Sequence, residues 1–189
     1  MIRSVGARAV CVVLAGALAL GAGVALAGCD ASAPAAATEG GGVQGRRFTV
    51  PQAFFGSKDE KASKQALEEA GGTDIVRDDD GNYTVTMSDA SFDAFCRADL
   101  DRTRQLLDAI PNSPDFPQVK SISYNDDLSE VTLACAKDDM GSQGENAAST
   151  AIYACCLHQV IAGQELSCTV ELVNSSGQII DTYSSPAGA

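Results

Sequence analysis

Three short turn sequences constrain the fold most: Asp78–Gly81, Asn125–Asp127 and Asn174–Gly177. Each lies between two stretches in which apolar and polar residues alternate, the period of a β-strand with one buried face. Because Asp, Asn and Gly favour tight turns, each unit is expected to form a β-hairpin. The six strands are expected over residues 73–77, 82–87, 119–124, 128–135, 165–173 and 178–183.

Helical patterns separate these hairpins. The longest covers residues 89–109, where apolar residues recur at helical spacing behind Ser88, a favourable N-cap. A later helix is expected from about residue 144 to residue 162, ended by Gly163. It carries no charged residue after Glu145, so it is expected to be the best covered of the helices.

The segment before the first hairpin predicts one more helix, over residues 58–70. Ser57 stands three residues before Glu60, which is the pattern of a capping box. The apolar stripe of this helix is thin, so it is expected to lie on the outside. Before it, residues 48–55 are apolar, but Pro51 argues against a central strand because proline cannot donate a ladder hydrogen bond.

The order of these elements predicts an α+β fold, with an antiparallel sheet from three sequential hairpins and about three helices packed on one face. Residues 48–189 are expected to form a single α+β domain. A domain of roughly 140 residues buries about two thirds of its unfolded surface, so disulfides are not required for folding.

The first 28 residues have the three parts of an export signal. Arg3 and Arg8 precede an uncharged, mostly apolar run over residues 9–27, which ends in small residues. A permanent membrane helix is the alternative, because the run nearly reaches the roughly 20 apolar residues that such a helix needs. The tetrad Leu26-Ala27-Gly28-Cys29 separates the two interpretations, since it resembles the lipobox of bacterial lipoproteins.

In that family the cysteine thiol receives a diacylglyceryl group and the signal is cut before the cysteine. The resemblance implies lipidation of Cys29 and cleavage between Gly28 and Cys29, with residues 1–28 as the signal peptide. Residues 29–47 would then be the lipidated cysteine and a flexible tether, which is too poor in apolar residues to fold. The expected location is the extracytoplasmic side of the cell membrane, with the membrane as a partner through the lipid anchor.

The charge of the chain excludes some partners. It has 13 basic and 25 acidic residues and a net charge of −12. Cleavage would remove Arg3 and Arg8 and no acid, which leaves 11 basic residues and a net charge of −14. Nucleic acid is therefore not an expected partner, because binding its phosphates depends on Lys and Arg. The acidic surface also has no attraction to anionic lipids, so the acyl anchor must hold the protein at the membrane.

Seven cysteines are present, but Cys11 belongs to the signal and Cys29 to the anchor. The cysteines that remain as candidates for disulfides are Cys96, Cys135, Cys155, Cys156 and Cys168. Their pairing is not fixed by the sequence. A bridge from the helix with Cys96 to the helix with the adjacent pair is one option, and buried free thiols are another.

The stretch Cys155-Cys156-Leu157-His158 contains the only histidine of the chain. Cys155 and His158 are three residues apart, so they can lie on one helix face. A thiol beside an imidazole is a candidate nucleophile or metal ligand. No second pair of closely spaced ligands accompanies it, so a structural role is expected and no catalytic or metal-binding residue is assigned.

Acidic turns raise the question of a cation site. Residues 78–80, 126–127 and 138–139 can together bind a cation if their tips lie close, but their spacing does not match the EF-hand template. The expected role is turn formation. No cofactor is expected, because phosphate-binding, dinucleotide-binding and zinc-protease motifs are all missing from the sequence.

The sequence therefore predicts a cell-envelope lipoprotein that displays a non-enzymatic domain, which binds an unknown protein or small-molecule ligand. Two alternatives remain open. One is an envelope enzyme or redox protein that uses Cys155, Cys156 and His158, and the other is a structural envelope protein.

Overall fold

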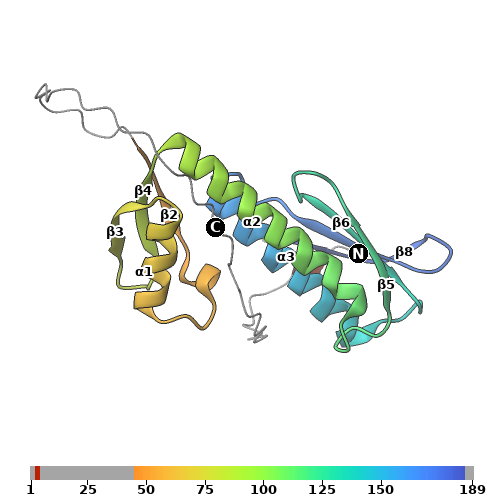
Figure 1. The fold of residues 1–189 in the computed structure, drawn as a ribbon. Coiled ribbons are helices and arrows are strands. Elements are labelled where there is room, and N and C mark those ends of the chain that lie inside the picture. Colours follow the sequence, from red (N-terminus) through yellow and green to blue (C-terminus); the bar gives the residue numbers. More distant parts are fainter. Residues whose placement is uncertain (1–2, 5–44, 186–189) are drawn as a thin grey trace, which may run out of the picture.

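The structure, a computed structural model, describes residues 3–4 and 45–185. In these residues the helices separate pairs of antiparallel strands, which confirms the α+β class (Figure 1). The helices are α1 (Glu60–Glu69), α2 (Asp89–Ala109) and α3 (Gly141–Ala162), with short 3-10 helices η1 (Gln52–Phe55) and η2 (Ile110–Asn112). The strands are β1 (Arg3–Ser4), β2 (Arg46–Val50), β3 (Thr73–Arg77), β4 (Tyr83–Met87), β5 (Val119–Tyr124), β6 (Glu130–Cys135), β7 (Thr169–Val173) and β8 (Ile179–Ser184).

The three expected hairpins are present. The strands β3 and β4, β5 and β6, and β7 and β8 each pair in the antiparallel sense. The prediction of a single antiparallel sheet is wrong. The described strands form two sheets, with the orders β2-β4-β3 and β1-β8-β7-β6-β5. In the larger sheet β6 and β7 are parallel, and β1 adds two residues parallel to β8.

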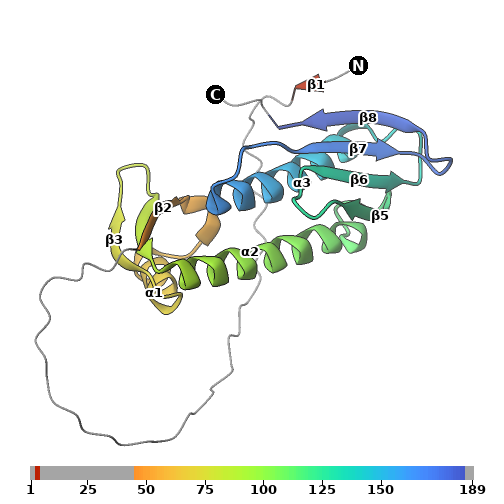
Figure 2. The same ribbon diagram turned by 90° about the horizontal axis from the view of Figure 1, so that it is seen from above.

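The helices between the hairpins explain this division. At 1.5 Å per residue, the 21 residues of α2 extend about 30 Å and carry the chain from the end of β4 to a separate place for β5 (Figure 2). The helix α3 connects β6 to β7 and returns the chain to the end of the sheet at which β6 began. A crossover of this kind makes the two strands parallel, whereas a tight turn would make them antiparallel.

Three of the expected helix ends are confirmed. The helix α2 covers residues 89–109, its N-cap Ser88 accepts a hydrogen bond from the backbone N–H of Ser91, and α3 ends at Gly163 in the left-handed conformation, with φ 68°. The start of α1 was predicted wrongly. Its N-cap is Asp59, whose carboxylate accepts a hydrogen bond from the backbone N–H of Ala62, whereas Ser57 lies before the helix.

The strand β2 lies at the edge of the smaller sheet, where it pairs with β4 from Arg46 opposite Met87 to Val50 opposite Tyr83. It ends directly before Pro51, in agreement with the expected effect of that proline. The chain therefore enters the described domain through an edge strand.

Each sheet has its own apolar core, and α2 contributes to both. Phe92, Phe95 and Cys96, in the first half of the helix, pack with the smaller sheet. Leu107, in the second half, packs with the larger sheet and α3. The helix α3 lies between α2 and the larger sheet (Figure 2). In residues 3–4 and 45–185, no helix has the length and hydropathy that crossing a membrane requires.

Candidate functional site

A buried pair of polar side chains joins α2 to α3 near the middle of α2. Nδ1 of His158 and Oδ2 of Asp99 are 2.8 Å apart, and their side chains are 6% and 4% exposed. Because a carboxylate only accepts hydrogen bonds, Nδ1 carries the proton in this contact. The pair lies between Cys96, which packs with the smaller core, and Leu100, which packs with the larger one.

A surface pocket of about 400 Å³ opens beside this pair. His158 lines it together with Cys96 and Leu100 of α2 and Ala162 at the end of α3. The second ring nitrogen, Nε2, has no hydrogen-bond partner among the described residues. His158 thus contributes to the lining of the same pocket as Cys96.

The electrostatics of the pocket do not favour a reactive thiol. Burial raises the pKa of the Cys96 thiol, and the nearby carboxylate of Asp99 raises it further. Arg46 acts in the opposite direction, but the net effect is a higher pKa. Since the thiolate is the nucleophile, Cys96 is held in its less reactive form at neutral pH.

The stretch from Cys155 to His158 does not form one cluster. Cys155 lies beside Cys168, which precedes β7, and both are buried in the larger core. His158 instead faces Asp99. The five candidate cysteines are all free thiols, and Cys96 is not bridged to Cys155 or Cys156.

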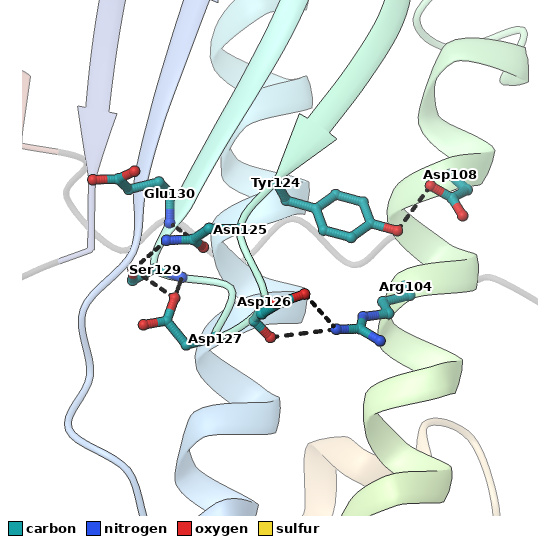
Figure 3. A network of polar contacts seen from close by, with 8 residues as sticks. All are labelled: Arg104, Asp108, Tyr124, Asn125, Asp126, Asp127, Ser129 and Glu130. Atoms are coloured by element: carbon teal, nitrogen blue, oxygen red, sulfur yellow. Dashed lines mark hydrogen bonds and ion pairs between the residues drawn. The ribbon is translucent and has the colours of Figure 1, made fainter.

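The acidic turn between β5 and β6 uses its polar groups to stabilise itself and to contact α2 (Figure 3). Arg104 of α2 lies 3.5 Å from the carboxylate of Asp126. Asp127 accepts hydrogen bonds from the backbone N–H and the hydroxyl of Ser129, and these bonds lower the pKa of its carboxyl group. The hydroxyl of Tyr124 donates to Asp108 of α2 at 3.0 Å.

The other acidic turns use local bonds as well. The carboxylate of Asp78 accepts from the backbone N–H and the side-chain amide of Asn82, and Asp139 accepts from the backbone N–H of Gly141. Within residues 3–4 and 45–185, no three His, Cys, Asp or Glu side chains are grouped in a way that can hold a metal ion. Turn formation accounts for Asp78, Asp127 and Asp139.

Asp99 and Cys96 were not expected beside His158, although the sequence carries a signal for the first of them. Asp99 falls on the apolar stripe of α2, seven residues after Phe92 and eight before Leu107, and all three are buried. A charged residue on the buried face of a helix requires a polar partner. The only histidine of the chain was one candidate beside the lysines and arginines, and the helix pairing that joins it to Asp99 is not visible in the sequence.

The signal peptide, the cleavage position at Gly28 and the lipidated Cys29 lie outside the described residues, apart from Arg3–Ser4. Comparisons of the chain with known protein families, with curated proteins and with solved structures found no match. The function of the candidate site is therefore inferred from its geometry alone.

Proposed function

We propose that the chain is an exported protein of the bacterial cell envelope, anchored by lipid at Cys29, whose domain binds a partner protein without catalysing a reaction. The anchor is supported by the tetrad Leu26-Ala27-Gly28-Cys29 after a basic start and an apolar run. Two acyl chains make membrane attachment durable, whereas one gives only reversible binding.

The solvent-facing side of α3 supports the binding role, and it is the observation that carries this part of the proposal. Tyr153 and Val160 are 58% and 40% exposed, although both are large and apolar. They are seven residues apart and so lie on one face, which also includes the half-buried Leu157. Tyrosine is enriched at protein interfaces and charged residues are depleted at their centres.

The uncharged character of this face is unusual for the chain. With a net charge of −12, most of the surface is expected to be acidic, but α3 carries no Asp, Glu, Lys or Arg after Glu145. An uncharged apolar face on an acidic protein gives a partner a place to dock, while the acidic residues elsewhere repel other acidic proteins. A protein partner therefore fits this face better than a charged small ligand.

The enzymatic alternative has less support. It required Cys155, Cys156 and His158 to act together, but His158 is bonded to Asp99 and Cys155 is in contact with Cys168. Burial also raises the pKa of the Cys156 thiol.

The anchor is tested by metabolic labelling with a fatty-acid probe in a bacterial host that processes lipoproteins. We expect the wild-type protein to be labelled and to sediment with membranes, and the Cys29→Ala variant to lose the label. Cys11→Ala is the matched control, because it removes a cysteine that the proposed signal peptide contains. Label that persists in Cys29→Ala would refute the anchor.

The binding face is tested by placing a photo-crosslinking amino acid at Tyr153 in intact cells. The control is Ile179, which is 57% exposed and also apolar but lies in β8. We expect a discrete adduct from position 153 that Val160→Lys abolishes, and no such adduct from position 179. Equal or absent adducts at the two positions would contradict a docking role for α3 and favour the structural alternative.

A further inference from the structure

Three thiols gather where the C-terminal half of α3 meets the start of β7. Cys155 and Cys156 belong to α3, and Cys168 directly precedes Thr169, the first residue of β7. Cys155 and Cys168 are buried, with 0% and 2% of their surface exposed, inside the larger apolar core. Cys156 is partly buried against the same core.

The backbone on both sides of Cys168 is fixed to its surroundings. The side-chain amide of Gln159 donates to the carbonyl oxygen of Ser167 at 2.9 Å and accepts from its backbone N–H at 3.1 Å. Ser185 donates its backbone N–H to the carbonyl oxygen of Cys168 at 2.8 Å, and its hydroxyl accepts from the Cys168 N–H at 3.1 Å. These bonds hold Cys168 against α3 and leave its side chain little freedom.

Cys155 and Cys168 are both buried in the larger core, and Cys155 lies one helical turn before Gln159, which holds Ser167 next to Cys168. The neighbouring Cys155 thiol, together with burial, raises the pKa of the Cys168 thiol. Cys156 is only partly buried, and its thiol lies near both Cys168 and the hydroxyl of Ser185. Complete burial of Cys155 in the core that contains Cys168 favours Cys155 over Cys156 as the partner of Cys168.

The other two cysteines lie too far away to compete. Glu130 pairs with Thr169 and Ala134 with Val173, so Cys168 precedes the first pair and Cys135 follows the last. Six strand residues separate the two ends, which is about 20 Å at 3.3 Å per residue. Cys96 packs with the smaller core, whereas Cys155 and Cys168 are buried in the larger one. A disulfide requires Cα atoms within about 7 Å.

We propose that Cys155 and Cys168 form a disulfide that fastens the C-terminal half of α3 to the start of β7, while Cys156 stays a free thiol. Burial of both cysteines in one core and the hydrogen bonds of Gln159 to Ser167 bring the two segments together. The bridge rests on the proposed export, since disulfides persist in oxidising compartments and rarely in the cytosol.

The reaction needs a disulfide oxidant, either a thiol–disulfide oxidoreductase or oxidised glutathione. One cysteine, as thiolate, attacks the oxidant's disulfide, which forms a mixed disulfide and releases one thiol. The second cysteine, also as thiolate, attacks the protein sulfur of that mixed disulfide and releases the second thiol. The protein loses two electrons and two protons, and the oxidant's disulfide is reduced to two thiols.

The sequence around these cysteines allows a direct peptide map. No Lys or Arg follows Lys137, so trypsin leaves all three thiols on one fragment. A protease that cleaves after glutamate cuts behind Glu145, Glu165 and Glu171. It therefore separates a peptide of residues 146–165, which carries Cys155 and Cys156, from a peptide of residues 166–171, which carries Cys168.

The full chain is unfolded in detergent and denaturant, refolded with reduced and oxidised glutathione, alkylated at low pH and digested without reduction. We expect the two peptides to be joined, with a mass lower by two hydrogens than the sum of the free thiol forms. Fragmentation should place the alkyl group on Cys156. Unjoined peptides, or a bridge from Cys168 to Cys156, would overturn the proposal.

Two variants give the matched comparison. Cys156→Ser should keep the joined peptides, and Cys155→Ser should lose the bridge that the wild type makes. The wild-type map does not depend on whether either variant folds. The same map on protein taken from cells tests the location separately: a bridge that forms with glutathione but is missing in cells supports the pairing and refutes the export.

Discussion

Removing the carboxylate of Asp99 should destabilise the whole domain, because Asp99 is the hydrogen-bond partner of His158 between α2 and α3. In Asp99→Ala the imidazole stays buried, with its side chain 6% exposed, but Nδ1 loses the carboxylate that lies 2.8 Å away. Alanine is too small to replace it and has no group that accepts a hydrogen bond.

The expected cost follows from this burial. An enclosed donor left without a partner costs about 1–3 kcal/mol, so we expect the free energy of unfolding to fall by about 2 kcal/mol. For a domain of this size each kcal/mol lowers Tm by roughly 2–4 °C, which gives a decrease of roughly 4–8 °C. Asp99→Asn should cost less, because the amide oxygen can still accept from Nδ1.

The assay is urea unfolding followed by circular dichroism, with Asp101→Ala as the control. Asp101 carries the same charge on the same helix but is exposed, so its replacement should change stability by less than about 0.5 kcal/mol. In a double-mutant cycle, the double variant of Asp99 and His158 is compared with the two single variants. The coupling energy from this cycle should be about 1 kcal/mol or more. Equal stabilities of the Asp99 and Asp101 variants, or additive effects in the cycle, would refute the reasoning.

Three further predictions concern helix ends and buried thiols. Asp59→Ala should destabilise the protein by about 1 kcal/mol in chemical denaturation, because it removes the N-cap of α1. Ser57→Ala should have no measurable effect. A larger loss of stability in Ser57→Ala than in Asp59→Ala would show that Ser57 is the cap. Gly163→Ala should cost about 1 kcal/mol in thermal unfolding, because φ there is 68° and a side chain is strained in the left-handed region; unchanged stability would show that α3 ends differently. Burial raises the pKa of the Cys135 thiol above its ordinary value of 9.0, so the folded state keeps this proton when the unfolded state has lost it. The stability of the reduced protein should therefore fall as pH rises above about 9, measured by unfolding from pH 8 to 10, and Cys135→Ala should weaken that dependence.

The local elements could be predicted because short-range signals determine them. Ser88 and Gly163 mark helix ends by their own hydrogen bonding and backbone conformation, and the hairpin turns carry their Asx and glycine residues in fixed places. At the start of α1 the pattern was misleading: Ser57 and Glu60 predicted a capping box, whereas Asp59 caps the helix. Asp is as favourable an N-cap as Ser, so the spacing of Ser57 and Glu60 was not sufficient to place the helix start.

The division into two sheets could not be predicted, because it depends on which strands meet after the helices have packed. Alternation along a strand shows that one face is buried but not which neighbour it pairs with. The parallel pairing of β6 and β7 is visible only once α3 is placed as a crossover. The contact of Asp99 with His158 depends on the same packing, since 58 residues separate them in the chain.

The edge strand β2 determines how the anchored protein that we propose would bear load. Tension between the lipid and the domain reaches the fold at Arg46, where β2 begins and pairs with Met87 of β4. The guanidinium of Arg46 also lies 4.0 Å from the ring centre of Phe92 on α2, so the pull passes to β4 and α2. Force applied through the proposed anchor would therefore load the smaller sheet and the first half of α2 before it reached the larger sheet.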